Sequence, residues 1–151
     1  MTFLVIAMGA AGSWASGFIS DRWGRTNFTA LMLTISGLCS IGIGLLFDGP
    51  SWPIVVVGLV WGFTVVADSA QFSAMVTEVG DQSYVGTALI MQIAIGFTIS
   101  AATIWIIPLA EGLTTWRWAF AVLALGPVIG IVAVLRVKRL PEAAKIAGGL
   151  G

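Results

Sequence analysis

The stretch "SDRWGRT" (residues 20–26) combines both signs of charge in a sequence that is otherwise poor in charge. Asp21, Arg22 and Arg25 stand between two long apolar runs, in a chain with seven basic and seven acidic residues among 151. A carboxylate and two guanidinium groups at this spacing can pair with one another or face the end of a neighbouring helix. They provide no nucleophile with an adjacent base, so the chemistry they favour is ion pairing.

Asp68 is the one ionisable side chain well inside an apolar run. Trp61, Thr64, Gln71 and Met75 recur around it at helical spacing, which predicts a polar stripe with Thr64 and Gln71 hydrogen-bonded to the carboxyl group. A charged aspartate costs about 2.5 to 3.5 kcal/mol at the centre of a spanning helix, so such residues are functional candidates by default. A carboxyl group that is alternately dry and wet can carry a proton; the alternative is an aspartate in a hydrated vestibule that orders its helix end.

Small and polar residues on other runs also repeat at helical spacing. Gln92 and Ser100, with Gly96 and Thr103, are expected on one face, as candidate cavity contacts or as interhelical hydrogen-bonding groups. Three further sets are read as packing faces where backbones approach closely: Gly9, Ser13 and Gly17; Ser36, Ser40 and Gly44; Gly58 and Gly62.

Composition indicates a membrane protein, because 58% of residues are hydrophobic and 9% are charged, against about a quarter charged in soluble proteins. The net charge is zero, which gives no general attraction to nucleic acid. The single cysteine, Cys39, excludes an internal disulfide, and the lack of histidine removes the commonest metal ligand and general base. We predict that the chain is not an enzyme and has no catalytic residue, metal or cofactor.

Five apolar segments are long enough to cross the bilayer, since about 20 helical residues span its hydrocarbon core. They predict an all-α bundle over 1–140 with spans near 3–19, 27–47, 53–76, 85–108 and 117–135, followed by a disordered cytoplasmic tail over 141–151. A kink is expected in the last span at Gly126, Pro127 and Gly130. Arg22 and Arg25 follow the first span and nothing basic precedes it, which argues against a signal peptide.

The lysines and arginines predict the orientation of these spans. If the N-terminus is outside, six of the seven are cytoplasmic and only Arg117 is outside, in agreement with the positive-inside rule. The prediction is therefore a multi-pass protein of the cell (inner or plasma) membrane with a cytoplasmic C-terminus, and "SDRWGRT" becomes a cytoplasmic turn.

Read from Gly17, this turn resembles the G-x-x-x-D-R-x-G-R-[RK] signature of the major facilitator superfamily of secondary transporters. Gly17, Asp21, Arg22, Gly24 and Arg25 match it, and Thr26 departs from it where the family has a second basic residue. The resemblance implies a cytoplasmic gating motif in which Asp21 docks onto the other half of the transporter, while Gly24 and Arg25 shape the turn. Glycine permits the backbone conformation that a tight reversal between antiparallel helices needs.

The resemblance also implies which part of a twelve-helix transporter this is. The basic residues after the last span and "TWRWAF" (115–120) favour helices 8 to 12, a partial half-bundle, with the third and fourth spans lining a cavity and the second and fifth facing outward. The partners are then the bilayer, a small solute, a coupling ion such as a proton, and the absent N-terminal half with helix 7. The expectation is a fragment that begins at an internal methionine; the alternative is a non-transporting five-helix membrane subunit that assembles with a partner.

Overall fold

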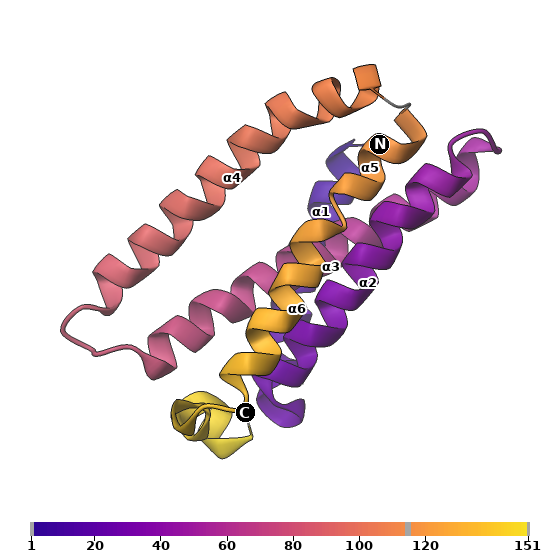
Figure 1. Ribbon diagram of the computed structural model, residues 1–151. Helices are drawn as coiled ribbons and strands as arrows, with labels where there is room; N and C mark the ends of the chain where they lie inside the picture. The colour runs from indigo at the N-terminus through magenta and orange to yellow at the C-terminus, as the bar shows by residue number, and fades with distance from the viewer. Residues whose placement is uncertain (1, 114–115, 151) are drawn as a thin grey trace.

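The computed structural model describes residues 2–113 and 116–150, and within them it contains helices and no strand. Five of its helical segments are long and apolar enough to cross a membrane, as the sequence predicts. Figure 1 shows the order of the elements: α1 (Thr2–Trp23), α2 (Arg25–Leu46), α3 (Ser51–Val79), α4 (Val85–Leu113), α5 (Trp116–Val122), α6 (Leu125–Val137) and the 3-10 segment η1 (Pro141–Gly149).

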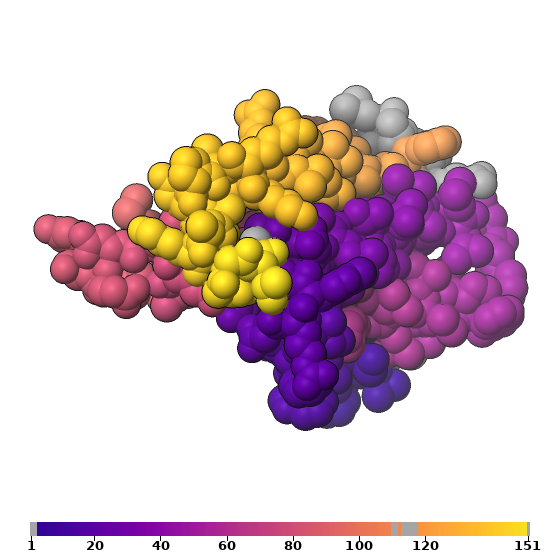
Figure 2. Space-filling view, turned by 90° about the horizontal axis from the view of Figure 1, so that it is seen from below, coloured from indigo at the N-terminus to yellow at the C-terminus, as the bar shows by residue number. Residues whose placement is uncertain are grey.

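The bundle is built around α2 and α3. Helix α2 packs against α1, α3, α5 and α6, and 44% of its spanning window is buried, the largest share of the five. The second span is expected to face outward in a complete transporter; in this bundle α5 and α6 pack against it, and its position in the complete protein stays a prediction. Helix α4 has no buried residue in its window and projects from the rest of the molecule (Figures 1 and 2).

Gly24 alone joins α1 to α2. Its φ of 87° and ψ of 130° lie in a region that L side chains rarely adopt, which confirms the predicted need for glycine at this turn. The amide of Gly24 still donates to the carbonyl oxygen of Ser20 at 3.0 Å. A single residue thus reverses the chain and brings the last turn of α1 beside the first turn of α2.

Helices α1 and α3 approach each other through glycines. A Cβ atom added at Gly12 lies 2.3 Å from the carbonyl oxygen of Phe63, and one added at Gly62 lies 2.5 Å from that of Val5. Gly9 also packs closely on α3, as predicted, but Gly12 takes the place expected for Ser13, and a Cβ at Gly17 meets nothing within 4 Å. The buried face of α1 runs through Gly9, Gly12, Ser16 and Ser20, and Gly17 lies beside it, so a regular spacing of four along α1 did not identify the contact.

The last span is broken between α5 and α6, which confirms the predicted kink. Pro127 has no amide hydrogen to donate to Leu123, and its ring displaces that carbonyl. The carbonyl of Leu123 instead accepts from the amide of Gly126 at 3.3 Å, in a tighter turn. In α4, by contrast, the helix continues through Pro108 to Leu113, beyond the predicted end at 108. Residues 114–115 of the expected connection lie outside the described residues.

The C-terminal segment differs from the disordered tail expected over 141–151. Residues Pro141–Gly149 form η1, which packs against α3. Ala143 and Ile146 are buried, with 0% of Ile146 exposed. Burial of these two apolar side chains offsets part of the conformational entropy that the segment loses when it is ordered.

Candidate functional site

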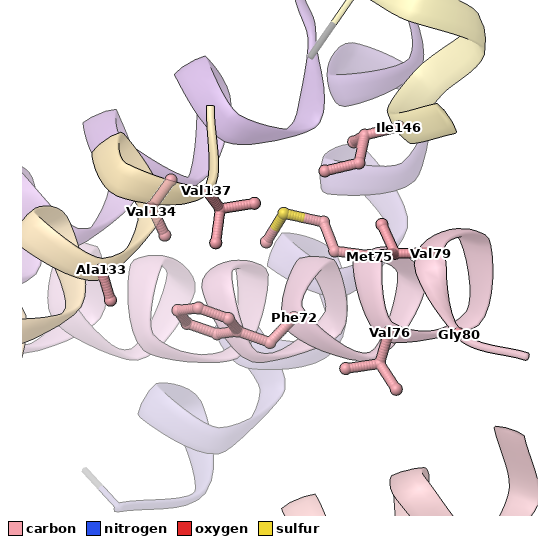
Figure 3. A pocket seen from close by; sticks show the side chains of 9 residues that line it. All are labelled: Phe72, Met75, Val76, Val79, Gly80, Ala133, Val134, Val137 and Ile146. Atoms are coloured by element: carbon pink, nitrogen blue, oxygen red, sulfur yellow. The ribbon is translucent and has the colours of Figure 1, made fainter. Parts of the chain in front are cut away.

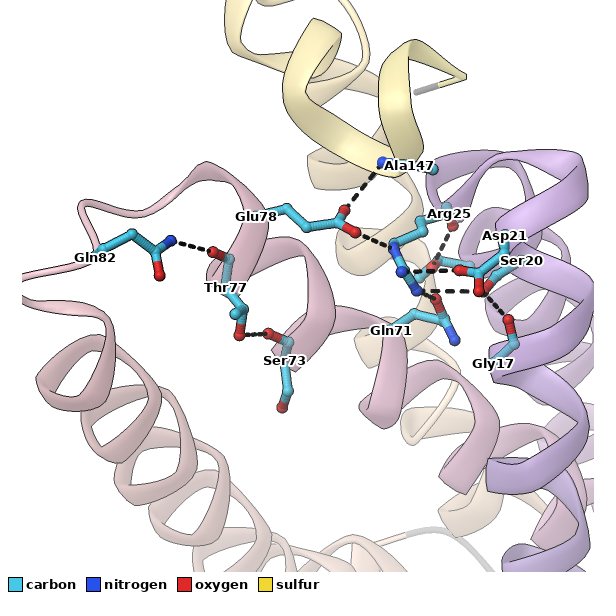
Figure 4. A network of polar contacts seen from close by, with 11 residues as sticks. Gly17, Ser20, Asp21, Arg25, Gln71, Ser73, Thr77, Glu78, Gln82 and Ala147 are labelled. Carbon is cyan, nitrogen blue, oxygen red and sulfur yellow. Dashed lines mark hydrogen bonds and ion pairs between the residues drawn. The ribbon is translucent and has the colours of Figure 1, made fainter.

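The Arg25 side chain is the centre of a polar network at one end of the bundle (Figure 4). It is 15% exposed, and its Nε atom donates to Oε1 of Glu78 at 2.9 Å. Its Nη2 atom lies 2.8 Å from Oδ1 of Asp21. One guanidinium group therefore joins the end of α1 to the end of α3.

The remaining guanidinium nitrogen completes the network. Nη1 of Arg25 donates to Oε1 of Gln71 at 3.2 Å and lies 3.4 Å from Oγ of Ser20. All three nitrogens are thus engaged, in the fixed fork geometry that distinguishes arginine from the single ammonium group of lysine.

The local sequence explains how these groups meet. Asp21 and Arg25 are four residues apart across the Gly24 turn. Gln71 and Glu78 are seven residues apart, so they lie on the same face of α3, two turns from each other. The second carboxylate oxygen of Glu78, Oε2, accepts from the amide of Ala147 at 3.0 Å, which adds η1 to the network.

The structure brings together three of the five motif residues, namely Asp21, Gly24 and Arg25. Arg22 lies outside the network, with its guanidinium carbon 4.5 Å from the centre of the Phe18 ring. Gly17 contributes only its carbonyl oxygen, which accepts from Oγ of Ser20 at 3.3 Å.

Glu78 is a member of the network that the sequence analysis missed. Two features of the sequence could have identified it. Glu78 follows Gln71 by one heptad, and the predicted topology places it on the same side of the membrane as Arg25. Acids well inside a span are the usual functional candidates, and Glu78 is not one of them because it lies one residue before the end of α3.

The predicted polar stripe of α3 is buried inside the bundle. Thr64 and Gln71 are each 2% exposed. Nε1 of Trp61 donates to Oγ of Ser36 on α2 at 3.0 Å, and Oγ1 of Thr64 donates to the carbonyl of Trp61 at 3.1 Å. The Trp61 contact joins α3 to α2, whereas the Thr64 contact stays within α3. Ser36, Ser40 and Gly44 are likewise buried on α2, as expected for a packing face.

Asp68 is 7% exposed and lies on this same buried face. Its Oδ1 accepts from Oγ of Ser69 at 3.1 Å, whereas Gln71 is bound to Arg25 and Thr64 to its own helix. The predicted hydrogen bonds from Thr64 and Gln71 to this carboxyl group are therefore wrong. Within the described part of the chain, no lysine or arginine lies at ion-pairing distance from Asp68.

Gln92 and Ser100 are on α4, where they line a groove against a different face of α3 from the one that carries Asp68. The groove has a volume of about 570 Å³, and its wall includes the hydroxyl groups of Ser69 and Ser73 and the rings of Phe72 and Phe97. Nε2 of Gln92 donates to Oγ of Ser73 at 3.3 Å, while its Oε1 is buried without a partner.

The predicted cavity residues are therefore divided between two places. Gln92 and Ser100 line the groove, whereas Trp61, Thr64, Asp68 and Gln71 face the bundle interior. Across the residues that the structure describes, no group of three or more histidine, cysteine, aspartate or glutamate side chains has the geometry to hold a metal ion.

Comparison with known proteins gives one transporter relative. The chain is 28% identical over 137 residues to the 3-(3-hydroxy-phenyl)propionate transporter of Escherichia coli (strain K12). The match covers 91% of this chain and 33% of the relative, so the chain spans about a third of that protein's length. No protein-family model matches the sequence. No solved structure matches it either.

Proposed function

We propose that this chain is the C-terminal part of a major facilitator superfamily transporter, with its five spans corresponding to helices 8 to 12. The complete protein then moves a small solute by alternating access, driven by an ion gradient. The observation that carries this proposal is the Arg25 network, in which the residues of the signature turn bind the end of α3. The transporter relative, matched along 91% of the chain, supports the transporter role in this proposal.

The network acts, in this proposal, as a cytoplasmic lock. Nζ of Lys138 donates to Oδ1 of Asn27 at 2.6 Å, so the basic end of α6 lies at the same end of the bundle as Arg25. The positive-inside rule then puts this end in the cytoplasm and the N-terminus outside. The Asp21 side chain is 60% exposed, which leaves it free to bind the other half of the transporter while it holds Arg25.

The groove between α3 and α4 is the proposed wall of the solute pathway, and Asp68 is the proposed coupling residue. The groove combines two aromatic rings with hydroxyl and amide groups. Such a surface suits the hydroxylated ring of the solute that the relative is named for, and that solute is the first one to assay. Because no lysine or arginine lines this groove, the solute's carboxylate needs a cation from elsewhere in the complete protein, such as the other half.

The test starts from the coding sequence upstream. An in-frame extension encoding seven further spans is expected, and cells making the extended protein should accumulate radiolabelled 3-(3-hydroxyphenyl)propionate. Cells making this chain alone serve as the control and should not, because the site between the two halves is then incomplete. Uptake by the chain alone, or an upstream region without spans, contradicts the proposal.

A non-transporting membrane subunit is the second candidate function, and the exposure of α4 favours it. Gly9 and Gly62, which belong to the predicted small-residue faces, pack between α1 and α3 inside the bundle and are not available to a separate partner. Helix α4 has no buried residue in its spanning window and is the surface available to such a partner. Stable co-purification with a separately encoded membrane protein, without transport, distinguishes this function from the first.

A further inference from the structure

The C-terminal segment η1 has one buried side and one exposed side. Ala143 is 7% exposed and Ile146 is 0% exposed. Their neighbours Ala144 and Lys145 are exposed. A segment lying loosely at the end of the bundle would not show this alternation, so η1 is docked through a defined face.

The buried face of η1 meets an apolar cavity of about 360 Å³ between α3 and α6 (Figure 3). The Ile146 side chain lines this cavity together with Met75 and Val79 of α3 and Val134 and Val137 of α6. The segment packs on α3, and its isoleucine closes one side of the cavity that α6 borders on the other.

A polar contact fixes the same segment from the other side. The amide of Ala147 donates to Oε2 of Glu78 at 3.0 Å, while Oε1 of Glu78 accepts from Arg25 at 2.9 Å. The two oxygens of one carboxylate therefore have different ligands, one in the tail and one in the bundle (Figure 4). Ala147 reaches this position with a φ of 47°, which is unusual for a residue with a side chain.

We propose that Pro141–Gly149 is a detachable strap, and that its docking and the Arg25–Glu78 ion pair stabilise each other through the Glu78 carboxylate. Docking fixes the rotamer of Glu78 and shields its carboxylate from water, which strengthens the ion pair. When the strap lifts, Glu78 loses one ligand and is solvated, so its hold on Arg25 weakens. This assigns a regulatory role to the tail and does not depend on transport by the chain.

Docking can be measured by thiol labelling of the chain in lipid nanodiscs. In a Cys39→Ser background, Ala143→Cys and Ala144→Cys place thiols on the buried and exposed sides of η1. A water-soluble maleimide should label position 143 about tenfold more slowly than position 144. Equal rates overturn the proposal, because the strap is then not docked.

Two substitutions of Ala147 separate the amide hydrogen bond from general disturbance. Ala147→Pro removes the amide hydrogen and cannot adopt positive φ, so labelling at position 143 should rise about tenfold. Ala147→Gly keeps the amide and adopts positive φ readily, so labelling should stay slow. No difference between these two variants counts against the contact with Glu78.

Substitution of Arg25 tests the mutual stabilisation. Arg25→Gln should raise labelling at position 143 by about threefold or more, because groups sharing one network are energetically coupled. Arg22→Gln, in the same turn but outside the network, should leave the rate unchanged. Circular dichroism confirms that the bundle is folded; if Arg25→Gln unfolds it, Arg25→Lys is measured instead. An unchanged rate in a folded Arg25 variant overturns the coupling.

Discussion

The Nε atom of Arg25 and the Oε1 atom of Glu78 lie 2.9 Å apart, although 53 positions separate the two residues in the sequence. This contact joins the start of α2 to the end of α3, at the end of the bundle where the chain also turns at Gly24. Partly buried, charge-assisted hydrogen bonds of this kind depend on geometry. We therefore expect their loss to destabilise the packing of α1, α2 and α3.

Arg25→Lys should destabilise the bundle although it keeps the charge. A single ammonium group cannot replace the three nitrogens that contact Glu78, Asp21 and Gln71. We expect a loss of about 1 to 3 kcal/mol, measured as a lower thermal midpoint in detergent. Arg22→Lys is the matched control and should leave the midpoint unchanged; equal effects from the two substitutions exclude a special role for Arg25.

Gly12→Ala and Gly17→Ala should have opposite effects on stability. The new Cβ at position 12 falls 2.3 Å from the carbonyl oxygen of Phe63, so α1 and α3 must move apart, at a cost of about 1 to 3 kcal/mol. The Cβ at position 17 meets nothing within 4 Å, and alanine is the better helix former by about 0.5 to 1 kcal/mol. Thermal unfolding of both variants compares them, and a loss of stability at position 17 equal to that at 12 contradicts the described crossing.

Cysteines at positions 49 and 82 should label from opposite sides of the membrane. Gly49 and Gln82 are exposed in turns at the two ends of α3. In a Cys39→Ser background, an impermeant thiol reagent added outside intact cells should react at position 49 and reach position 82 only after the membrane is permeabilised. The reverse pattern inverts the proposed orientation.

Asp68→Asn should separate stability from coupling. Asparagine keeps the shape of the side chain and removes a buried acid that the described residues leave without a cationic partner, so the bundle should be as stable as before or more stable. In the complete protein, reconstituted in liposomes with an imposed pH gradient, uphill accumulation should be lost while downhill exchange continues. Normal accumulation by this variant eliminates Asp68 as the coupling residue.

The sequence was sufficient to predict the spans, the Gly24 turn and the kink near Pro127. Hydropathy over about 20 residues, backbone freedom at glycine and the missing amide of proline are local properties, so they act wherever the chain folds. The α-helical class and the number of spans follow from the same local information.

The candidate site was predicted less well, because its contacts depend on how α3 is rotated within the bundle. Helical spacing placed Thr64, Asp68 and Gln71 on one face correctly. It could not show that this face is buried inside the bundle, or that Gln92 faces a different side of α3. The docking of Ile146 depends on a cavity formed by α3 and α6 together, and neither helix reveals it alone.

The close crossing of α1 and α3 has a mechanical consequence. The backbone of Phe63 lies directly against Gly12, and the side chains of Val5 and Val66 pack beside this contact. Because such close packing leaves little room for sliding, we expect α1 and α3 to move together. Helix α4 joins α3 through the turn after Val79 and has no buried residue in its spanning window, so we expect it to swing relative to α3 more easily than α1 does. Such a swing widens or narrows the groove at Gln92 without bending α3, which carries Asp68.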